Sequence, residues 1–466
     1  MRVPRLIVAA VGACGLAAAA MAAAGPAPGL SGLATVTVQP GVIRIGHAQS
    51  GPPTTADCEK AYKVACYEPG QIQQAYHLPE VYASGVTGRG ATIVIVDSYG
   101  SPTIKNDLSV FDRTFGLAAP PSFRIIQPAG KVPAYNPANS DMVGWAGETT
   151  LDVEYAHTVA PGANLLLVET PVSETEGVHG FPQIVQAEEY VLNHHLGDVI
   201  SQSFSATEQT FPSKQAVQAL RGAYQLAAKD KVTVLTASGD SGAADVGPDQ
   251  STYYLSPVTS WPDSDPLVTG VGGTQLHFNS AGQPAAPTVW NDTYSKTTNE
   301  FADGDAGPNP LAGGGGKSIF FTRPWYQNGV RNVVGDRRGV PDVSMSASCN
   351  GSVDTYGTFG GAPAGWTPSC GTSEATPLFA GIVALADQVA GHSLGLINPA
   401  LYQLSAEHAP GITDVTSGNN TVSFAQGGRL QTVRGFTARP GYDLAAGVGT
   451  VNAEYFVREL AFLAGH

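Results

Sequence analysis

Residues 91–100, ATIVIVDSYG, decide the fold. They form an apolar run of strand length that ends in Asp97 and turn-forming residues. Four similar runs follow along the chain, and helix-like segments separate them. Near-continuous apolar strands that alternate with helices are typical of a parallel sheet covered on both faces. The sequence therefore predicts an α/β fold with a mostly parallel central sheet and helices on both faces.

The later strand-like runs are ANLLLVET (163–170), DVISQSFS (198–205), VTVLTASGDSG (232–242) and PLVTGVGGT (266–274). The helix-like segments are FPQIVQAEEYVLNHH (181–195), KQAVQALRGAYQLAAKD (214–230) and MVGWAGETTLDVEYAHTV (142–159). A shorter strand-like run, TVTVQPGVIRIG, comes earlier, at residues 35–46. The span 283–317 is polar and Gly-rich and ends in GGGG, which is typical of a long loop.

Composition restricts the kind of partner. The chain has 466 residues, a hydrophobic fraction of 42% and a formal net charge of -14. The hydrophobic fraction is near that of globular proteins, so a compact body with many ordered loops is expected. We expect no nucleic-acid partner, because phosphate binding needs a basic surface and this chain is acidic.

The N-terminus has the pattern of a secretory signal. Arg2 and Arg5 precede an Ala-rich apolar stretch, and small residues suited to cleavage surround Ala24. We expect residues 1–24 to be a signal peptide, 25–65 a short N-terminal or pro segment, and 66–466 one catalytic domain. An uncleaved membrane anchor and a lipoprotein on Cys14 are the alternatives. The expected protein is secreted and monomeric, with no stable membrane partner.

Four cysteines remain after the signal, and an even number in an exported chain indicates disulfides. They allow three connectivities. We favour the local pairing of Cys58 with Cys66 and of Cys349 with Cys370. Four buried thiols are the alternative. The second disulfide would brace the loop that leads to Ser373.

Several side chains suited to catalysis stand at positions where α/β folds place their sites. Asp97 and Asp240 follow predicted strands, and sites lie at the carboxyl ends of strands. Ser373 stands in CGTSEATP, where a small-residue turn runs into a helix-like stretch. Glu148 and Asp152 are four residues apart, so their carboxylates share one helix face. A solvated acidic face is the alternative for that pair.

A hydroxyl nucleophile needs a base, and the base needs an orienting group. If Glu148 reaches Ser373, it can accept the hydroxyl proton while Asp152 orients it. Two such carboxyls share a proton best in acid, because free carboxyls titrate near pH ~4. Protonated Asp240 and the backbone N–H of Ser373 could then stabilise a tetrahedral oxyanion.

These motifs, taken together and in this order, resemble the sedolisin family of serine-carboxyl peptidases, which has a subtilisin-like fold. The resemblance covers about Cys66 to Gly449. It implies that Ser373 is the nucleophile, Glu148 the base, Asp152 its partner and Asp240 the oxyanion-hole residue, with proteins or peptides as substrates. The matching stretches are GETTLDVEYAHTVAPGANL, TASGDSG, GGGGKSIFFTRPWYQ, RGVPDVSMSA (338–347) and CGTSEATPLFAGIVAL.

The resemblance also implies one structural Ca²⁺ ion near the C-terminus, in GITDVTSG and ARPGYDLAAGVG. Asp414 and Asp443 would supply carboxylates, and Val415, Arg439 and Gly441 would supply backbone carbonyls. Ligation by oxygen alone suits this hard cation. Arg439 stands where the family usually has glycine.

Two other functions compete with this one. An ordinary Ser-His-Asp protease would use Asp97 as the acid and His157 as the base, but His157 lies late in a helix-like segment and is expected to be structural. The second is an inactive, calcium-stabilised binding protein on the same fold. All four catalytic positions carry suitable residues, which favours the enzyme.

Overall fold

The computed structural model describes residues 36–38, 43–174, 180–293 and 308–465. Within these residues, eight strands form the central sheet, seven of them in the order β12-β11-β9-β7-β4-β6-β5, and the eighth, β15, also pairs with β11. All pairings are parallel except that of β12 with β11. The bounds are β4 Thr92–Ser98, β5 Phe123–Ile126, β6 Asn164–Thr170, β7 Val199–Gln202, β9 Thr233–Ala237, β11 Thr269–Phe278, β12 Pro284–Val289 and β15 Val343–Ser346.

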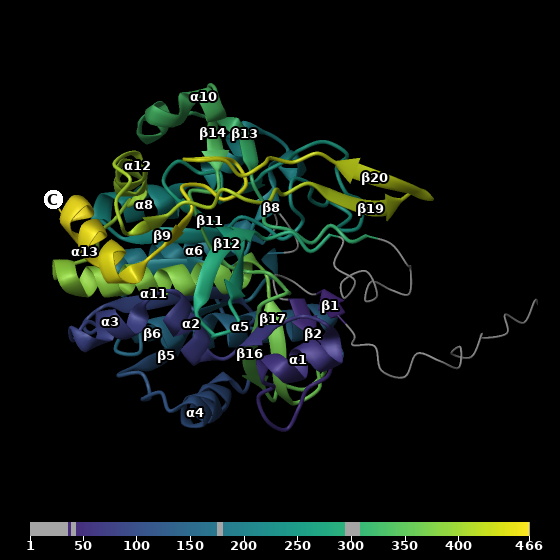
Figure 1. Ribbon diagram of the computed structural model, residues 1–466, viewed down its shortest axis with the longest axis vertical. Helices are drawn as coiled ribbons and strands as arrows, with labels where there is room; N and C mark the ends of the chain where they lie inside the picture. Colours follow the sequence, from purple (N-terminus) through teal and green to yellow (C-terminus); the bar gives the residue numbers. More distant parts are fainter. Residues whose placement is uncertain (1–35, 39–42, 175–179, 294–307, 466) are drawn as a thin grey trace, which may run out of the picture.

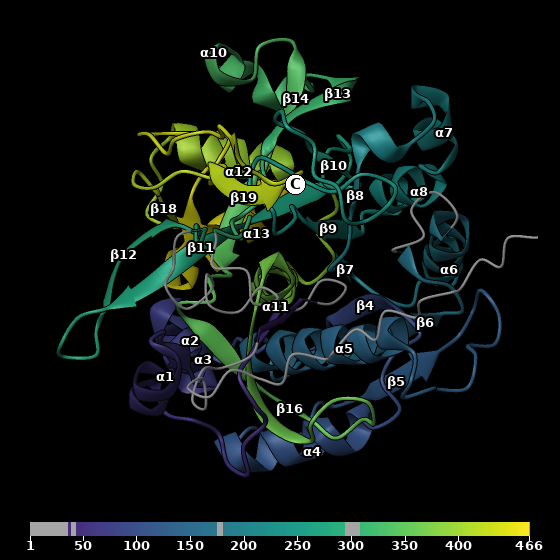
Figure 2. The ribbon, with the colours of Figure 1, turned by 90° about the vertical axis from the view of Figure 1, so that its right-hand side faces the viewer.

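Helices cover both faces of this sheet, as predicted. In β4, Ile93 and Ile95 pack into the core that also contains α5 (Ser140–Val159) and α11 (Thr372–Ala390). The alternate residues Val94 and Val96 pack into a second core with α6 (Phe181–Asn193) and α8 (Gly222–Asp230). Successive strand side chains point to opposite faces, so burial on both faces explains the continuous apolar run. Figures 1 and 2 show α11 beside α5 at the centre of the molecule.

A second sheet leads to the predicted nucleophile. It has five strands in the order β1-β2-β17-β16-β3. Its strand β17 ends immediately before α11, and the N-terminal strand β2 pairs with β17. The bounds are β1 Val36–Val38, β2 Ile43–Ile45, β3 Cys66–Tyr67, β16 Ser352–Gly357 and β17 Gly365–Cys370.

Two predictions about elements were wrong. The segment 214–230 forms two helices, α7 (Lys214–Ala219) and α8, instead of one. The break lies at Arg221, whose guanidinium is tied to Asp265 by hydrogen bonds of 2.6 and 2.9 Å. The span 283–317 is not one loop, because β12 and the start of β13 (Gly316–Thr322) lie within it. β12 is an edge strand, where its prolines are tolerated.

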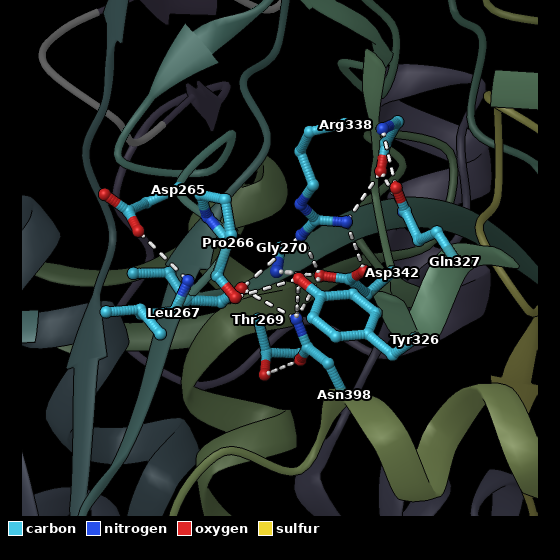
Figure 3. A network of polar contacts seen from close by, with 12 residues as sticks. Asp265, Pro266, Leu267, Thr269, Gly270, Tyr326, Gln327, Arg338, Asp342 and Asn398 are labelled. Carbon is cyan, nitrogen blue, oxygen red and sulfur yellow. Dashed lines mark hydrogen bonds and ion pairs between the residues drawn. The ribbon is translucent and has the colours of Figure 1, made fainter. Parts of the chain in front are cut away.

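The stretch RGVPDVSMSA contributes to a buried polar network (Figure 3). Arg338 and Asp342 form a fully buried ion pair with a 2.6 Å hydrogen bond. Asp342 also accepts the backbone N–H of Gly270 and the hydroxyl of Tyr402, each at 2.8 Å. The network therefore ties β14 (Arg337–Val340) to β11 and to α12 (Asn398–Ala406).

The remaining described elements are short or peripheral. Among the described residues, no helix has the length and hydrophobicity that crossing a bilayer requires. The predicted signal peptide lies outside the described residues. The other elements are α1 Thr55–Tyr62, α2 Pro69–Ala75, α3 Leu78–Ala83, α4 Ile104–Phe115, β8 Ala206–Thr207, β10 Ser260–Trp261, α10 Arg331–Val334, β18 Ile412–Thr413, β19 Val422–Gln426, β20 Arg429–Val433, β21 Thr450–Val451 and α13 Ala453–Ala464.

Candidate active site

Glu148 and Asp152 lie on one face of α5, and both are fully buried. The helix is capped at its N-terminus by Asn139, whose side chain accepts the backbone N–H groups of Asp141 and Met142. Burial, and then the charge of Asp152, raise the pKa of Glu148 well above its usual value. Burial also raises the pKa of Asp152. Since two adjacent buried carboxylates repel each other, the pair holds at least one proton over a wide pH range.

Ser373 is the second residue of α11 and is only 1% exposed. The Cys349–Cys370 disulfide anchors the end of β17, as predicted, and Cys58 pairs with Cys66. Gly371 then turns the chain into the helix with φ at 126°, which favours glycine.

The side chain of Ser373 reaches the base that the sequence predicts. Its hydrogen bonding lowers the pKa of Glu148, against the larger effect of burial. Neither Glu148 oxygen has a strictly aligned hydrogen bond within the described part of the chain. The two side chains are therefore neighbours, in an arrangement that suits proton transfer.

Asp240 lies in the turn after β9 and faces the start of α11. Its Oδ1 accepts the backbone N–H and the hydroxyl of Thr372, both at 2.7 Å. Burial raises the pKa of Asp240 to about 6. Below that pH the carboxyl is protonated, and because Oδ1 takes both bonds from Thr372, Oδ2 can donate to a substrate oxygen.

The Gly-rich end of the span 283–317 supports the Asp240 turn. The Ala312 N–H donates to the Asp240 carbonyl at 3.0 Å, and the Gly314 N–H donates to the Gly239 carbonyl at 2.7 Å. A Cβ on Gly314 would lie 1.9 Å from the Ser238 carbonyl oxygen, so no larger residue fits this close approach. The glycines thus position Asp240 and do no chemistry themselves.

Sequence reasoning missed Ser203, which links two of the predicted catalytic residues. Its hydroxyl donates to Asp152 Oδ1 at 2.8 Å and lies 3.4 Å from the carbonyl oxygen of Ser373. Pro377, inside α11, has no N–H to bond that carbonyl four residues earlier. The proline four residues after Ser373 therefore indicates that a group outside the helix can donate to the Ser373 carbonyl. It does not indicate which group that is.

Asp97 and His157 do not form a catalytic dyad. His157 Nε2 lies 2.8 Å from the Ala118 carbonyl oxygen and 3.4 Å from Asp112 Oδ1. Burial lowers the pKa of His157 to about 4, so the ring is neutral above that pH. His157 is structural, as predicted. Asp97 is fully buried at the end of β4, and its charge raises the pKa of both Glu148 and Asp152.

The predicted calcium ligands come together in two adjoining loops. Asp443 accepts the backbone N–H of Arg439, and Asp414 accepts that of Gly441, both at 2.8 Å. The charge of Asp414 contributes to raising the pKa of Asp443, after burial. Within the described residues, the carbonyls of Val415, Arg439 and Gly441 accept no backbone hydrogen bond. Two close carboxylates and unused carbonyls fit a hard cation.

That fit rests on carbonyl oxygens as much as on side chains. No cluster of three or more His, Cys, Asp or Glu side chains suited to a metal occurs among the residues that the structure describes. A set with two carboxylates is compatible with this finding.

Comparisons with known proteins agree with the geometry. The model of the subtilase family matches residues 134–427, which include the predicted base, oxyanion residue and nucleophile. The chain belongs to the subtilase family. Within that family it belongs to the sedolisin branch, which confirms the resemblance and the fold predicted from sequence.

The relatives give the extent of the similarity. Kumamolisin of Bacillus sp. (strain MN-32) is 31% identical, over 82% of this chain and 62% of its own length. Sedolisin of Pseudomonas sp. (strain 101) is 28% identical, over 80% of this chain and 59% of its own length. The solved Pseudomonas sedolisin, a serine-carboxyl proteinase complexed with pseudo-iodotyrostatin, superposes with a TM-score of 0.66 and 26% identity, over 86% of this chain and 97% of that one. The chain thus spans about three fifths of the length of these curated relatives.

Proposed function

We propose that this chain is a secreted serine-carboxyl peptidase that hydrolyses peptide bonds in proteins or peptides at acidic pH. The observation that carries the proposal is the convergence of Glu148, Asp152 and Asp240 on the start of α11, where Ser373 lies. Kumamolisin and sedolisin, the relatives named above, support this choice of reaction.

The proposed reaction begins with proton transfer from Ser373 Oγ to ionised Glu148. The oxygen attacks the carbonyl carbon of the scissile bond, and Asp152, held by Ser203, orients Glu148. Protonated Asp240 and the backbone N–H of Ser373 donate to the oxyanion. Glu148 then gives its proton to the leaving amine, and water hydrolyses the acyl-enzyme on Ser373 by the same steps in reverse order.

The proposed Ca²⁺ ion has a structural role only. Asp414 and Asp443, with the carbonyls of Val415, Arg439 and Gly441, would hold it. When bound, the ion would offset the repulsion between the two carboxylates and fasten their loops together.

The pH dependence of hydrolysis of a denatured protein substrate tests the proposed function. We expect the greatest activity at pH ~3–5, because the base is a carboxyl and Asp240 must be protonated to donate to the oxyanion. Ser373→Ala is the control and should show no turnover. A neutral or alkaline optimum would contradict the carboxylate mechanism, and absence of activity in the mature protein would favour the binding role.

A further inference from the structure

The N-terminal strand β2 lies directly beside the strand that carries the nucleophile. It pairs antiparallel with β17, with Ile43 opposite Cys370 and Arg44 opposite Ser369. Ile43 and Ile45 are each 1% exposed and pack into the main core. Because strand side chains alternate in direction, Arg44 points to the other face of the sheet.

The guanidinium of Arg44 rests on the helix turn that carries Glu148. It lies over the ring of Phe359, 4.8 Å from the ring centroid. A Cβ added to Gly147 would lie 1.7 Å from Arg44 Nη2 and 2.6 Å from Cζ. The guanidinium therefore occupies the space that any larger side chain at position 147 would need. Glycine inside a helix costs about 1 kcal/mol relative to alanine, and this contact explains its presence there.

Arg44 brings a positive charge to a group of carboxyls. Burial lowers the pKa of Arg44 to about 10, and the charges of Tyr135 and Glu148 oppose that shift. The groups that act on Glu148 are Asp152 on its own helix and, from other elements, Asp97 on β4, Asp240 after β9 and the hydroxyl of Ser373 on α11. The three carboxyls all favour protonation of Glu148, whereas a cation favours its ionised form.

We infer that Arg44 is a positioning residue for the catalytic base, which offsets part of the burial and carboxylate repulsion acting on Glu148 and so favours the ionised form that can accept the proton of Ser373. The inference rests on the proposed function and deepens it. It also assigns β2 to the working enzyme, although the sequence predicts a pro segment over residues 25–65. A strand whose isoleucines lie in the main core, and whose arginine touches the catalytic helix, belongs to the active domain.

The first test is the pH dependence of kcat/KM in Arg44→Gln. Loss of one charge near Glu148 should move the acidic limb of the profile up by about 1 pH unit, with the alkaline limb unmoved. Arg44→Lys should restore at least half of the shift. Arg124→Gln, on the exposed side of β5, is the matched control and should leave the limb in place. An unmoved acidic limb in folded Arg44→Gln would overturn the inference.

The second test keeps the arginine and moves it. Gly147→Ala places a methyl group where Nη2 lies, and alanine is the better helix former, so the variant should fold. Its acidic limb should also move up. In the double variant with Arg44→Gln, Gly147→Ala should add no further shift, because there is no guanidinium left to displace. An equal shift with and without Arg44 would overturn the inference, even if Arg44→Gln alone does not fold.

A third measurement separates this inference from the proposed function. The active species, labelled at serine by a fluorophosphonate probe, should have an N-terminus that precedes Arg44. Labelled enzyme that begins after residue 48 and is still active overturns the role of Arg44 and leaves the peptidase assignment intact. Turnover that survives in Ser373→Ala would instead refute the proposed function.

Discussion

The Ser203 hydroxyl donates a 2.8 Å hydrogen bond to Asp152 Oδ1, from the residue directly after β7 to the middle of α5. Both residues are buried. A hydrogen bond to a buried carboxyl of this kind lowers the pKa of Asp152 against the effect of burial. Ser203 therefore helps to decide where the shared proton of the Glu148–Asp152 pair lies.

Ser203→Ala should lower kcat/KM about 10- to 100-fold while the fold is retained, because hydrogen bonds to charged groups contribute about 1.5–3 kcal/mol. Ser201→Ala is the matched control. It removes a buried hydroxyl from the same part of the chain, and that hydroxyl has no hydrogen-bond partner in the described structure. Steady-state kinetics at pH ~4 and circular dichroism check the prediction. Equal losses in both variants would show that Ser203 is only a packing residue.

Asp240→Asn should change the alkaline limb of the pH profile. In the wild type, activity should fall as pH rises through about 6, where Asp240 loses the proton that it donates to the oxyanion. An amide donates at every pH, so the variant should keep measurable activity at pH ~7 relative to its own maximum. If the alkaline limb stays in place in the variant, another group controls it and the oxyanion role of Asp240 is wrong.

Stability should be greater in acid than at neutral pH. Burial raises the pKa of Asp97 to about 7 and that of Asp354 to about 8. The stabilisation that each carboxyl contributes is fully present below its unfolded-state pKa of ~4. It is lost as pH rises through its folded-state pKa. Urea unfolding should therefore show a lower free energy of unfolding at pH 8 than at pH 5.

The variant Asp354→Asn isolates one of these contributions, because both oxygens of Asp354 are buried without a hydrogen bond among the described residues. Its loss of stability between pH 5 and pH 8 should be smaller than that of the wild type, by up to ~4 kcal/mol. The control is Asp249→Asn, at an exposed residue whose pKa hydrogen bonds lower to about 2. The charge of Asp249 is constant between pH 5 and pH 8. The change in the free energy of unfolding over this range should therefore be the same in Asp249→Asn as in the wild type. A wild-type protein equally stable at both pH values would contradict the prediction.

Chelation should lower the melting temperature through loss of mass-action stabilisation by Ca²⁺. Asp443→Asn should have a lower melting temperature in the presence of calcium and should respond little to chelator. Differential scanning fluorimetry with elemental analysis of the same samples measures both effects. An unchanged melting curve after confirmed metal removal would rule out the ion.

Much of the site could be predicted from sequence because its parts follow local rules. The spacing of Glu148 and Asp152 places them on one helix face whatever the rest of the fold does. Asp240 follows an apolar strand, and a small-residue turn before a helix marks Ser373. The order of these motifs along the chain resembles one family, which supplies the expectation that they meet.

The remaining features depend on contacts between distant segments. Ser203 gave no local signal, because its role comes from the neighbouring α5 and from the missing N–H of Pro377. Arg44 lies in an isolated strand-like run, and its pairing with β17 brings it beside Gly147, the residue before Glu148. The need for glycine at position 147 likewise depends on a distant segment, because the guanidinium that fills the space beside it comes from Arg44.

Turnover by Glu148→Gln at pH ~4 tests the central claim, that a carboxylate is the base, most directly. The glutamine keeps the shape of the side chain but cannot accept the proton of Ser373, so kcat should fall by at least about 10²-fold. Circular dichroism should show an unchanged fold. Activity near that of the wild type in a folded Glu148→Gln protein would contradict the account.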